Sequence, residues 1–246
     1  GDDAVEAVVV AGGDGTVSAA AGAAARTGAT LGIIPLGTMN FFARSLGIPA
    51  ERNAAAEALA DGEVQTADVG TANGRVFVHA LSLGIHPAMV KEREKLDYHS
   101  RYGKMLASLR AFVSVLRHRR RFDVTIETDG GSIRRRTAGL VVSNNPLGEG
   151  HAPYADRLDD GLLAVYVTSA QSIFDLVRVT ASAALGAGPS HPLVEEHQTR
   201  RALILIRGRP VPITLDGELV PLAGEIEVAS VPAGLKVLAP RRAAPA

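Results

Sequence analysis

The sequence predicts an α/β domain with a parallel sheet, followed by a mainly antiparallel β domain. Up to about Val69, short apolar runs alternate with alanine-rich helical stretches, which is typical of strands joined by crossover helices. After Val69 the apolar runs lengthen and short turns join them, which favours antiparallel hairpins. A chain of 246 residues has room for one large or two modest domains.

The first domain, residues 1–70, is expected to hold two buried strands and three helical segments. The strands are predicted at Ala4–Val10 and Thr30–Ile34, and the helices at Val17–Ala25, Phe41–Leu46 and Arg52–Ala60. Gly62 follows the last of these helices, a place where glycine commonly ends a helix. The cluster Gly70–Gly74 is rich in turn residues, so we place the domain boundary there, between Val69 and Arg75.

The second domain, residues 71–239, is expected to consist mainly of strands. Its strands are predicted at Phe122–Thr128, Arg134–Val142, Leu203–Ile206, Val211–Leu215, Glu225–Val231 and Leu235–Leu238, and its helices at Tyr102–Leu116 and Ile173–Leu185. The turn Asp129–Gly131 would join the first two strands. The last strand is free to return to the first domain. Residues 240–246 are low in complexity and are expected to form a flexible tail.

Composition excludes several classes of function. The 26 basic and 26 acidic residues balance, so nothing indicates a general attraction to nucleic acid. Without cysteine there is no zinc-thiolate site, iron–sulfur cluster or thiol nucleophile, and a metal would be a hard ion held by oxygen. The chain starts without Met, has no secretory signal and no apolar run of about 18 residues. We expect a soluble, cytoplasmic protein and a fragment of a longer chain.

A glycine-rich loop, Gly12-Gly13-Asp14-Gly15-Thr16, joins the first strand to the first helix. Glycines let the backbone come close to a bulky anion, and the amides at the following helix start point toward it. Asp14 would repel a phosphate group unless a metal ion or a proton lies between them, so its presence argues for a metal or acid/base role. The alternative is a tight turn in which Asp14 is a capping residue.

A second loop, Pro35-Leu36-Gly37-Thr38-Met39-Asn40, also follows a strand and precedes a helical stretch. The carboxyl ends of parallel strands share one edge of the sheet, so the two loops can converge on one polyphosphate. Gly37 offers close approach, and Thr38 and Asn40 offer side-chain donors.

Two acidic segments in the second domain are further candidates. Asp216-Gly217-Glu218 lies between apolar runs, so it is a hairpin turn or a turn that presents a catalytic carboxylate. Base catalysis from such a carboxylate contributes roughly 10² to 10⁴ in rate. Asp156, Asp159 and Asp160 form an oxygen-rich cluster suited to Mg²⁺ or Ca²⁺, although a solvated turn explains the cluster equally well.

These motifs together resemble the diacylglycerol kinase catalytic-domain family, which includes bacterial lipid kinases and the sphingosine and ceramide kinases. The resemblance covers nearly the whole chain. Its motifs are Gly12–Thr16, Pro35–Asn40 with Phe42–Arg44 and Gly47–Pro49, Ser82–Gly84, Leu158–Leu162 and Asp216–Glu218. The first loop alone is also similar to the corresponding loop of NAD kinases and phosphofructokinases. The second loop and the late Asp-Gly-Glu triplet are what distinguish the diacylglycerol kinase family from those two.

The resemblance implies an NAD kinase/diacylglycerol kinase-like enzyme in which an α/β nucleotide-binding domain is joined to a mainly antiparallel β-sandwich domain. The ATP-binding residues it implies are Gly12, Gly13, Asp14, Gly15, Thr16, Gly37, Thr38 and Asn40. Glu218 would act as base or help to hold catalytic Mg²⁺, sharing the catalytic work with Asp14 and with Asp216 of the same turn. A structural Mg²⁺ would be held by the Asp160 side chain and the backbone carbonyls of Arg157 and Leu162.

The sequence departs from the family at two places. Many relatives have an aspartate after the asparagine of the second loop, where this chain has Phe41, so one carboxylate of the metal-linked water network is missing. Relatives also carry a strand and loop upstream of the first motif with further nucleotide contacts. We therefore expect the chain as given to bind ATP weakly.

Charged and imidazole side chains add little to the site. We interpret the basic clusters at Lys91–Lys95, Arg117–Arg121 and Arg134–Arg136 as solvated faces. Docking on anionic lipid, at about 1 kcal/mol per basic residue near the surface, is the alternative. The seven histidines show no metal-binding spacing, so none is assigned a role.

We therefore expect an ATP- and Mg²⁺-dependent kinase that transfers the γ-phosphoryl group to a membrane lipid, diacylglycerol first, giving phosphatidic acid. It would contact the membrane peripherally, and a homodimer is left open. The alternatives are a non-catalytic lipid- or nucleotide-binding module and a soluble-metabolite kinase of the NAD kinase type. A deep apolar pocket near Glu218 would favour the lipid kinase. A cleft with polar, aromatic-lined walls at the same place would favour a kinase whose acceptor is a nucleotide.

Overall fold

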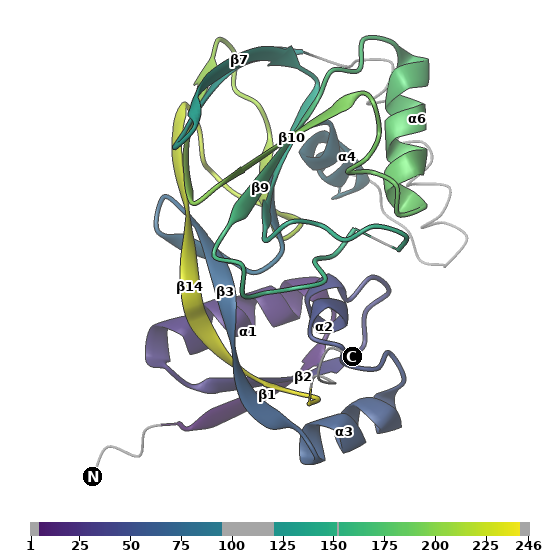
Figure 1. Ribbon diagram of the computed structural model, residues 1–246, viewed down its shortest axis with the longest axis vertical. Helices are drawn as coiled ribbons and strands as arrows, with labels where there is room; N and C mark the ends of the chain where they lie inside the picture. The colour runs from purple at the N-terminus through teal and green to yellow at the C-terminus, as the bar shows by residue number, and fades with distance from the viewer. Residues whose placement is uncertain (1–4, 95–120, 152, 242–246) are drawn as a thin grey trace.

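The structure is a computed structural model, and it describes residues 5–94, 121–151 and 153–241. The helix expected at Tyr102–Leu116, most of the basic cluster Arg117–Arg121 and most of the tail lie outside these residues. The described chain forms two lobes, with the N-terminal elements in the lower lobe of Figure 1.

The first domain has the predicted parallel sheet with helices packed on it. Its strands are β1 (Ala7–Gly12) and β2 (Thr30–Pro35), and its helices are α1 (Asp14–Thr27), α2 (Phe41–Ser45) and α3 (Arg52–Ala60). β1 and β2 pair in parallel, so both strands end at the same edge of the sheet. α1 buries Val17, Ala21 and Ala24, and it ends at Gly28, whose positive φ of 76° suits a residue without a Cβ.

Two long strands connect the lobes. β3 (Glu63–Ala72) and β14 (Glu225–Ala239) pair antiparallel along both domains, and Figure 1 shows them running from one lobe into the other. The lower half of β14 also pairs in parallel with β2, through Lys236 and Val237. The last strand therefore enters the first domain.

The prediction of two separate strands at Glu225–Val231 and Leu235–Leu238 was wrong. β14 is continuous, with a bulge between Val231 and Leu235 at which Ala233 takes a positive φ of 52°. Pro232 and Gly234 look like strand breakers in the sequence, but a bulge accommodates both residues without ending the strand.

The second domain is built from two antiparallel layers. Beyond β14, the first sheet continues with β11 (Arg201–Arg207), β6 (Phe122–Thr128) and β7 (Gly131–Thr137), and β3 also pairs with β4 (Arg75–Phe77). The second sheet has the order β10 (Val194–Thr199), β9 (Leu163–Thr168), β8 (Gly139–Asn144), β5 (Ala80–Gly84), β12 (Ile213–Leu215) and β13 (Glu218–Leu219). The buried faces of both sheets supply the core between them, which includes Leu81, Leu140, Val165, Ile126 and Ile204.

Among the boundaries that differ from the prediction, two depend on strand pairing. The strand expected at Arg134–Val142 is split at Ala138, because β7 pairs with β6 in the first sheet and β8 pairs with β5 and β9 in the second. The turn cluster expected at Gly70–Gly74 is shorter, because β3 continues to Ala72 and only Asn73 and Gly74 form the turn. Both errors arise where long-range pairing decides how far a strand extends.

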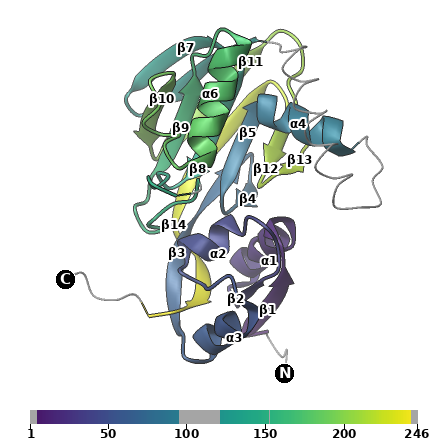
Figure 2. The same ribbon diagram turned by 90° about the vertical axis from the view of Figure 1, so that its right-hand side faces the viewer.

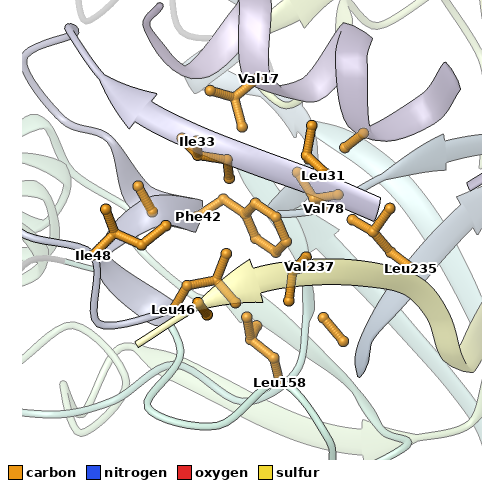
Figure 3. Packing of buried hydrophobic residues seen from close by; sticks show 14 of the residues in the cluster. Val17, Leu31, Ile33, Phe42, Leu46, Ile48, Val78, Leu158, Leu235 and Val237 are labelled. Carbon is orange, nitrogen blue, oxygen red and sulfur yellow. The ribbon is translucent and has the colours of Figure 1, made fainter. Parts of the chain in front are cut away.

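The core of the first domain includes residues from the second. Figure 3 shows Phe42 of α2 surrounded by Leu31 and Ile33 of β2 and Val237 of β14. Leu158, from the loop after β8, is packed into the same cluster. The domains therefore share packed side chains at the junction where the candidate site lies.

Two helices of the second domain face the same side as this junction. α4 (Ile85–Glu94) packs against β5 and β13, and α6 (Ile173–Ala184) lies beside it (Figure 2). α6 begins with a capping box, in which the Ser172 hydroxyl accepts from the Asp175 amide and the Asp175 carboxylate accepts from the Ser172 amide. None of the helices in the described residues is long and apolar enough to cross a membrane.

Candidate active site

The first glycine loop joins the end of β1 to the start of α1. Gly13 is the N-cap of α1, and its carbonyl accepts a hydrogen bond from the Val17 amide at 3.0 Å. A Cβ on Gly12 would lie only 2.7 Å from the Thr16 Cβ, so this position requires glycine. The free amides of the first helical turn are donors for an anion, and the helix dipole favours negative charge there by about 0.3 to 1 kcal/mol.

The second loop lies directly against the first. The Leu36 amide donates to the Gly12 carbonyl at 2.8 Å. A Cβ on Gly37 would lie 2.8 Å from the Gly13 Cα, so this close approach of the two backbones requires glycine at position 37. The structure thus brings both predicted loops together at one edge of the sheet.

Asp14 bridges the two loops with its carboxylate. Its Oδ2 accepts from the Asn40 amide at 2.9 Å, and its Oδ1 accepts from the Phe41 amide at 2.7 Å. These amides belong to the start of α2, whose own N-cap residue, Asn40, makes no side-chain cap. Asp14 therefore does act as a capping residue, but for the helix of the other loop.

The side chains of the second loop are divided between shaping the loop and facing solvent. Asn40 has a positive φ of 50°, and its amide group bonds Gly37 twice: Oδ1 accepts from the Gly37 amide at 2.9 Å and Nδ2 donates to the Gly37 carbonyl at 2.8 Å. Asn40 thus holds the loop in shape. Thr38 is exposed, as is Thr16 of the first loop, so both hydroxyls are accessible to a ligand.

Glu218 reaches the first glycine loop from the far end of the sequence. Its Oε1 lies 2.7 Å from the point at which a Cβ on Gly15 would stand, so the missing side chain of Gly15 makes room for the carboxylate. Glu218 is the first residue of β13 and is exposed to solvent. A solvent-accessible carboxylate is therefore held beside the start of α1.

Asp216 fastens the turn that carries Glu218. Its Oδ1 accepts from the amides of His79 and Ala80, each at 2.9 Å. Its Oδ2 accepts from the Val78 amide at 2.9 Å and from the Ser18 hydroxyl at 2.5 Å. With four donors, the buried carboxylate ties α1, the β4–β5 connection and the turn to one another.

The residues of this fastening also include one that the sequence analysis missed, His79. Its ring stacks on Phe41, with ring centroids 4.4 Å apart and an angle of 16° between the planes. Desolvation lowers the pKa of His79, while the charges of Asp216 and Asp14 act in the opposite direction. The available signal was a lone histidine inside the apolar run Val76–Leu83, which by itself is more typical of a core residue.

The acidic loop proposed for a structural metal ion is engaged in other contacts. The Asp160 carboxylate lies 3.3 Å from the Arg157 guanidinium, which also bonds Asp159 at 3.1 Å. The Leu162 carbonyl accepts from the Asn145 amide at 3.1 Å. The Asp160 carboxylate and the carbonyls of Arg157 and Leu162 are hard-oxygen donors of the kind that Mg²⁺ takes. In this structure, however, the Asp160 carboxylate forms an ion pair with Arg157.

The third carboxylate of this acidic loop, Asp156, is also paired. The Asp156 carboxylate pairs with His151 at 2.8 Å. Within residues 5–94, 121–151 and 153–241, no group of three or more His, Asp or Glu side chains has the arrangement of a metal site.

A second missed residue, Asp68, explains how the acidic loop is fixed. Asp68 is buried in β3, where its Oδ2 accepts from the Gly161 amide at 2.7 Å and from the Asn145 side chain at 3.2 Å. Its Oδ1 accepts from the Ala233 amide at 2.9 Å. The carboxylate thus joins β3, the loop after β8 and the bulge of β14.

A cavity of about 430 Å³ lies next to the second glycine loop. Its lining residues are Pro35, Leu36, Gly37, Ala50, Glu51, Arg52 and Asn53. Glu218 is not among them, so this cavity does not supply the apolar pocket expected near that residue.

Comparison with known proteins matches the two halves of the chain to two domain families. Residues 1–72 match the diacylglycerol kinase catalytic domain, and residues 80–239 match the YegS C-terminal NAD kinase beta sandwich-like domain. A crystal structure of a diacylglycerol kinase from Bacillus anthracis superimposes with a TM-score of 0.68 at 21% identity, covering 95% of this chain and 76% of that one. This likeness supports the fold alone.

Sequence relatives extend the match over the whole chain. A diacylglycerol kinase of Mycobacterium tuberculosis is 33% identical over 255 residues, covering 96% of this chain and 77% of the relative. An uncharacterized protein of Synechocystis is 28% identical over 239 residues, covering 95% of this chain but only 54% of the relative. The chain therefore spans about half the length of the cyanobacterial protein and three quarters of the mycobacterial one. It belongs to the diacylglycerol kinase family, with the catalytic domain followed by a YegS-type β-sandwich domain.

Proposed function

We propose that the protein is an ATP- and Mg²⁺-dependent lipid kinase that phosphorylates the hydroxyl of diacylglycerol and releases phosphatidic acid. One observation carries the proposal: Glu218 lies against Gly15, at the start of the helix that follows the first glycine loop. Membership of the kinase family supports the reaction class. The identity of the lipid acceptor and the use of ATP are tested by a transfer assay.

In this proposal the two glycine loops hold the triphosphate. The amides of Gly13 to Thr16 and the exposed Thr38 hydroxyl would donate to its oxygens, and Asp14 keeps the loops together through the amides of Asn40 and Phe41. Asp14 and Asn40 then act by positioning the loops. Asp216 does the same for the turn, since all its bonds join protein groups, and we assign it a positioning role.

Glu218 would be the base for the acceptor. As the lipid oxygen bonds to the γ-phosphorus, the bond from that phosphorus to the bridging oxygen breaks and ADP leaves. The hydroxyl proton passes to Glu218. Because the transition state of phosphoryl transfer is loose, we expect positioning and charge neutralisation to supply more of the rate than this proton transfer.

Magnesium enters the proposal in two places. When bound with ATP, Mg²⁺ would neutralise charge on the β- and γ-phosphates. A structural ion would require Asp160 to exchange Arg157 for the metal, with the carbonyls of Arg157 and Leu162 as further donors. Chelation would then weaken the loop that these residues form.

The acceptor side of the site is next to α4. This helix packs against β13, the strand that begins with Glu218, and Figure 2 shows it above α1 and α2 on the same face of the molecule. Pro87 and Val90 of α4 are buried, while the second half of the helix, Lys91–Glu94, is charged. The choice of a lipid acceptor therefore rests on membership of the kinase family.

The test is transfer of labelled phosphate from ATP to a panel of acceptors: diacylglycerol, ceramide, sphingosine and NAD⁺. We expect labelling of diacylglycerol, loss of at least 100-fold in Glu218→Gln, and no change in Glu127→Gln, an exposed glutamate on β6. Labelling of NAD⁺ alone would replace the proposal by a metabolite kinase. Binding of lipid vesicles with no transfer to any acceptor would replace it by a binding module.

A further inference from the structure

A pair of stacked rings lies between the glycine loops and the Asp-Gly-Glu turn. Phe41 belongs to α2, and its amide donates to Asp14. His79 belongs to the connection between β4 and β5, and its amide donates to Asp216. The two rings stack with their centroids 4.4 Å apart. This stack therefore links the residue bonded to Asp14, in the glycine loops, to the residue bonded to Asp216, in the Asp-Gly-Glu turn.

The imidazole of His79 is positioned by stacking on Phe41, which leaves its two ring nitrogen atoms able to hydrogen-bond a ligand. Its backbone is fully engaged, since the carbonyl accepts from the Asn144 amide at 2.8 Å and from the Ser143 hydroxyl at 3.4 Å. Within the part of the chain that the structure describes, neither ring nitrogen makes a hydrogen bond, and the side chain is only partly buried. A ligand in the site can therefore meet an oriented donor and acceptor.

The charges around this ring make its protonation state depend on the ligand. The segments Gly12–Thr16, Gly37–Asn40 and Asp216–Glu218 contain three carboxylates and no Lys or Arg. The carboxylates whose charges act on the ring are Asp216 and Asp14, and the uncharged Phe41 stacks on its face. Arg44 of α2 donates instead to the Met39 carbonyl at 2.7 Å. A bound polyphosphate would thus add negative charge beside three segments that themselves carry no cationic side chain.

We propose that His79 contacts the nucleotide: on binding of a nucleoside triphosphate its imidazole takes up a proton from solvent and donates a hydrogen bond to the terminal phosphoryl group. This inference rests on the proposed function, because it assumes the triphosphate between the loops. Phe41, stacked on the imidazole, keeps the ring in place. The site would therefore have a titratable base beside the phosphates.

The sign of the pH dependence follows from linkage. Burial lowers the pKa of His79 in the free protein, so the ring is mainly neutral at pH 7. Phosphate charges favour the imidazolium and raise that pKa in the complex. Affinity for the nucleotide should therefore rise as the pH falls through the bound-state pKa, by up to about tenfold per unit, and level off below the free-state pKa.

The experiment is isothermal titration of the protein with MgATP at pH 7 in two buffers of different ionisation enthalpy, which counts the protons taken up. We expect the wild type to take up a fraction of a proton, up to about half of one, more than His79→Gln does. The control is His197→Gln, on β10 at the edge of the second sheet, which should take up as many protons as the wild type. Equal uptake by the wild type and His79→Gln would overturn the inference.

A second measurement needs no substitution. Nuclear magnetic resonance of the protein with ¹⁵N-labelled histidine follows its seven imidazoles with and without MgATP. We expect one histidine to shift its pKa upward by about one unit on binding, and none of the others to do so. Nucleotide binding without such a shift would overturn the inference and leave the proposed function standing, whereas absence of nucleotide binding would overturn both.

Discussion

Replacing Gly15 by alanine should make the protein less active without making it less stable. Gly15 is in the first turn of α1, where alanine is the better helix former by about 0.5 to 1 kcal/mol. The added Cβ would stand 2.7 Å from Glu218 Oε1, whereas ordinary contact begins at 3.4 Å. The carboxylate must therefore move by about 0.7 Å, which an exposed side chain can do at little cost in folding energy.

The magnitude follows from the need for close placement of catalytic groups. A misplacement on the order of 1 Å can cost about 100-fold in rate, which corresponds to about 2.7 kcal/mol in activation free energy. We therefore expect Gly15→Ala to lower kcat about 100-fold. A stability gain of up to about 1 kcal/mol would raise Tm by about 2 to 4 °C in a chain of this size.

The assay is labelled phosphate transfer to diacylglycerol, measured beside thermal unfolding. Gly22→Ala is the matched control, because it lies in the same helix and its Cβ would meet only Arg26 Nη1, at 3.7 Å. This variant should gain stability and keep its activity. Gly15→Ala with wild-type activity, or with activity lost only because the protein unfolds, would refute the reasoning about Glu218.

Three other substitutions test how the structure holds the site. Asp216→Asn places an NH₂ group against the amides of Val78 and His79, which are themselves donors. We therefore expect the free energy of unfolding, measured in denaturant melts, to fall by about 2 to 4 kcal/mol. A fall of less than about 0.5 kcal/mol would contradict the role of Asp216 in fixing the turn. Gly70→Ala would bring a Cβ to 2.1 Å from the buried Phe77 ring and should cost about 1 to 3 kcal/mol or more, whereas Gly130→Ala, with 3.8 Å to its nearest neighbour, should be neutral in the same melts. The hydrogen bond from the Ser172 backbone amide is the main cause that lowers the pKa of Asp175. The ionised carboxylate therefore contributes to the free energy of unfolding above the ordinary pKa of aspartate, and this contribution is lost as the pH falls through the lowered pKa. In denaturant melts the wild type should be more stable than Asp175→Asn at pH 6. A stability difference between the two proteins that persists at pH 2 would show that the ionised Asp175 carboxylate is not its source.

The elements that could be predicted from sequence are those set by local signals. α3 was predicted at Arg52–Ala60 and is found there, because its alanine-rich stretch is bounded by a capping residue, Glu51, and by Gly62. β2 was predicted within one residue. The continuous β14 and the split at Ala138 could not be found this way, because both depend on which strand pairs with which across the sheets.

The same distinction applies to the site. The three motifs could be found because glycine and carboxylate clusters stand out at strand ends, and parallel pairing of β1 with β2 brings the first two together. The roles of the side chains could not be found, since Asp14 caps a helix 26 residues away and Asp216 binds amides about 137 residues away. His79 was missed because its significance comes from neighbours distant in sequence.

The central claim is that residues far apart in the chain surround one triphosphate, and a crystal structure with a non-hydrolysable ATP analogue tests it most directly. The account predicts terminal phosphate oxygens about 3 Å from amides of the Gly13–Thr16 segment and from the Thr38 hydroxyl, with Glu218 beside the γ-phosphate. A triphosphate bound elsewhere, for example in the cavity between Gly37 and Asn53, would contradict it.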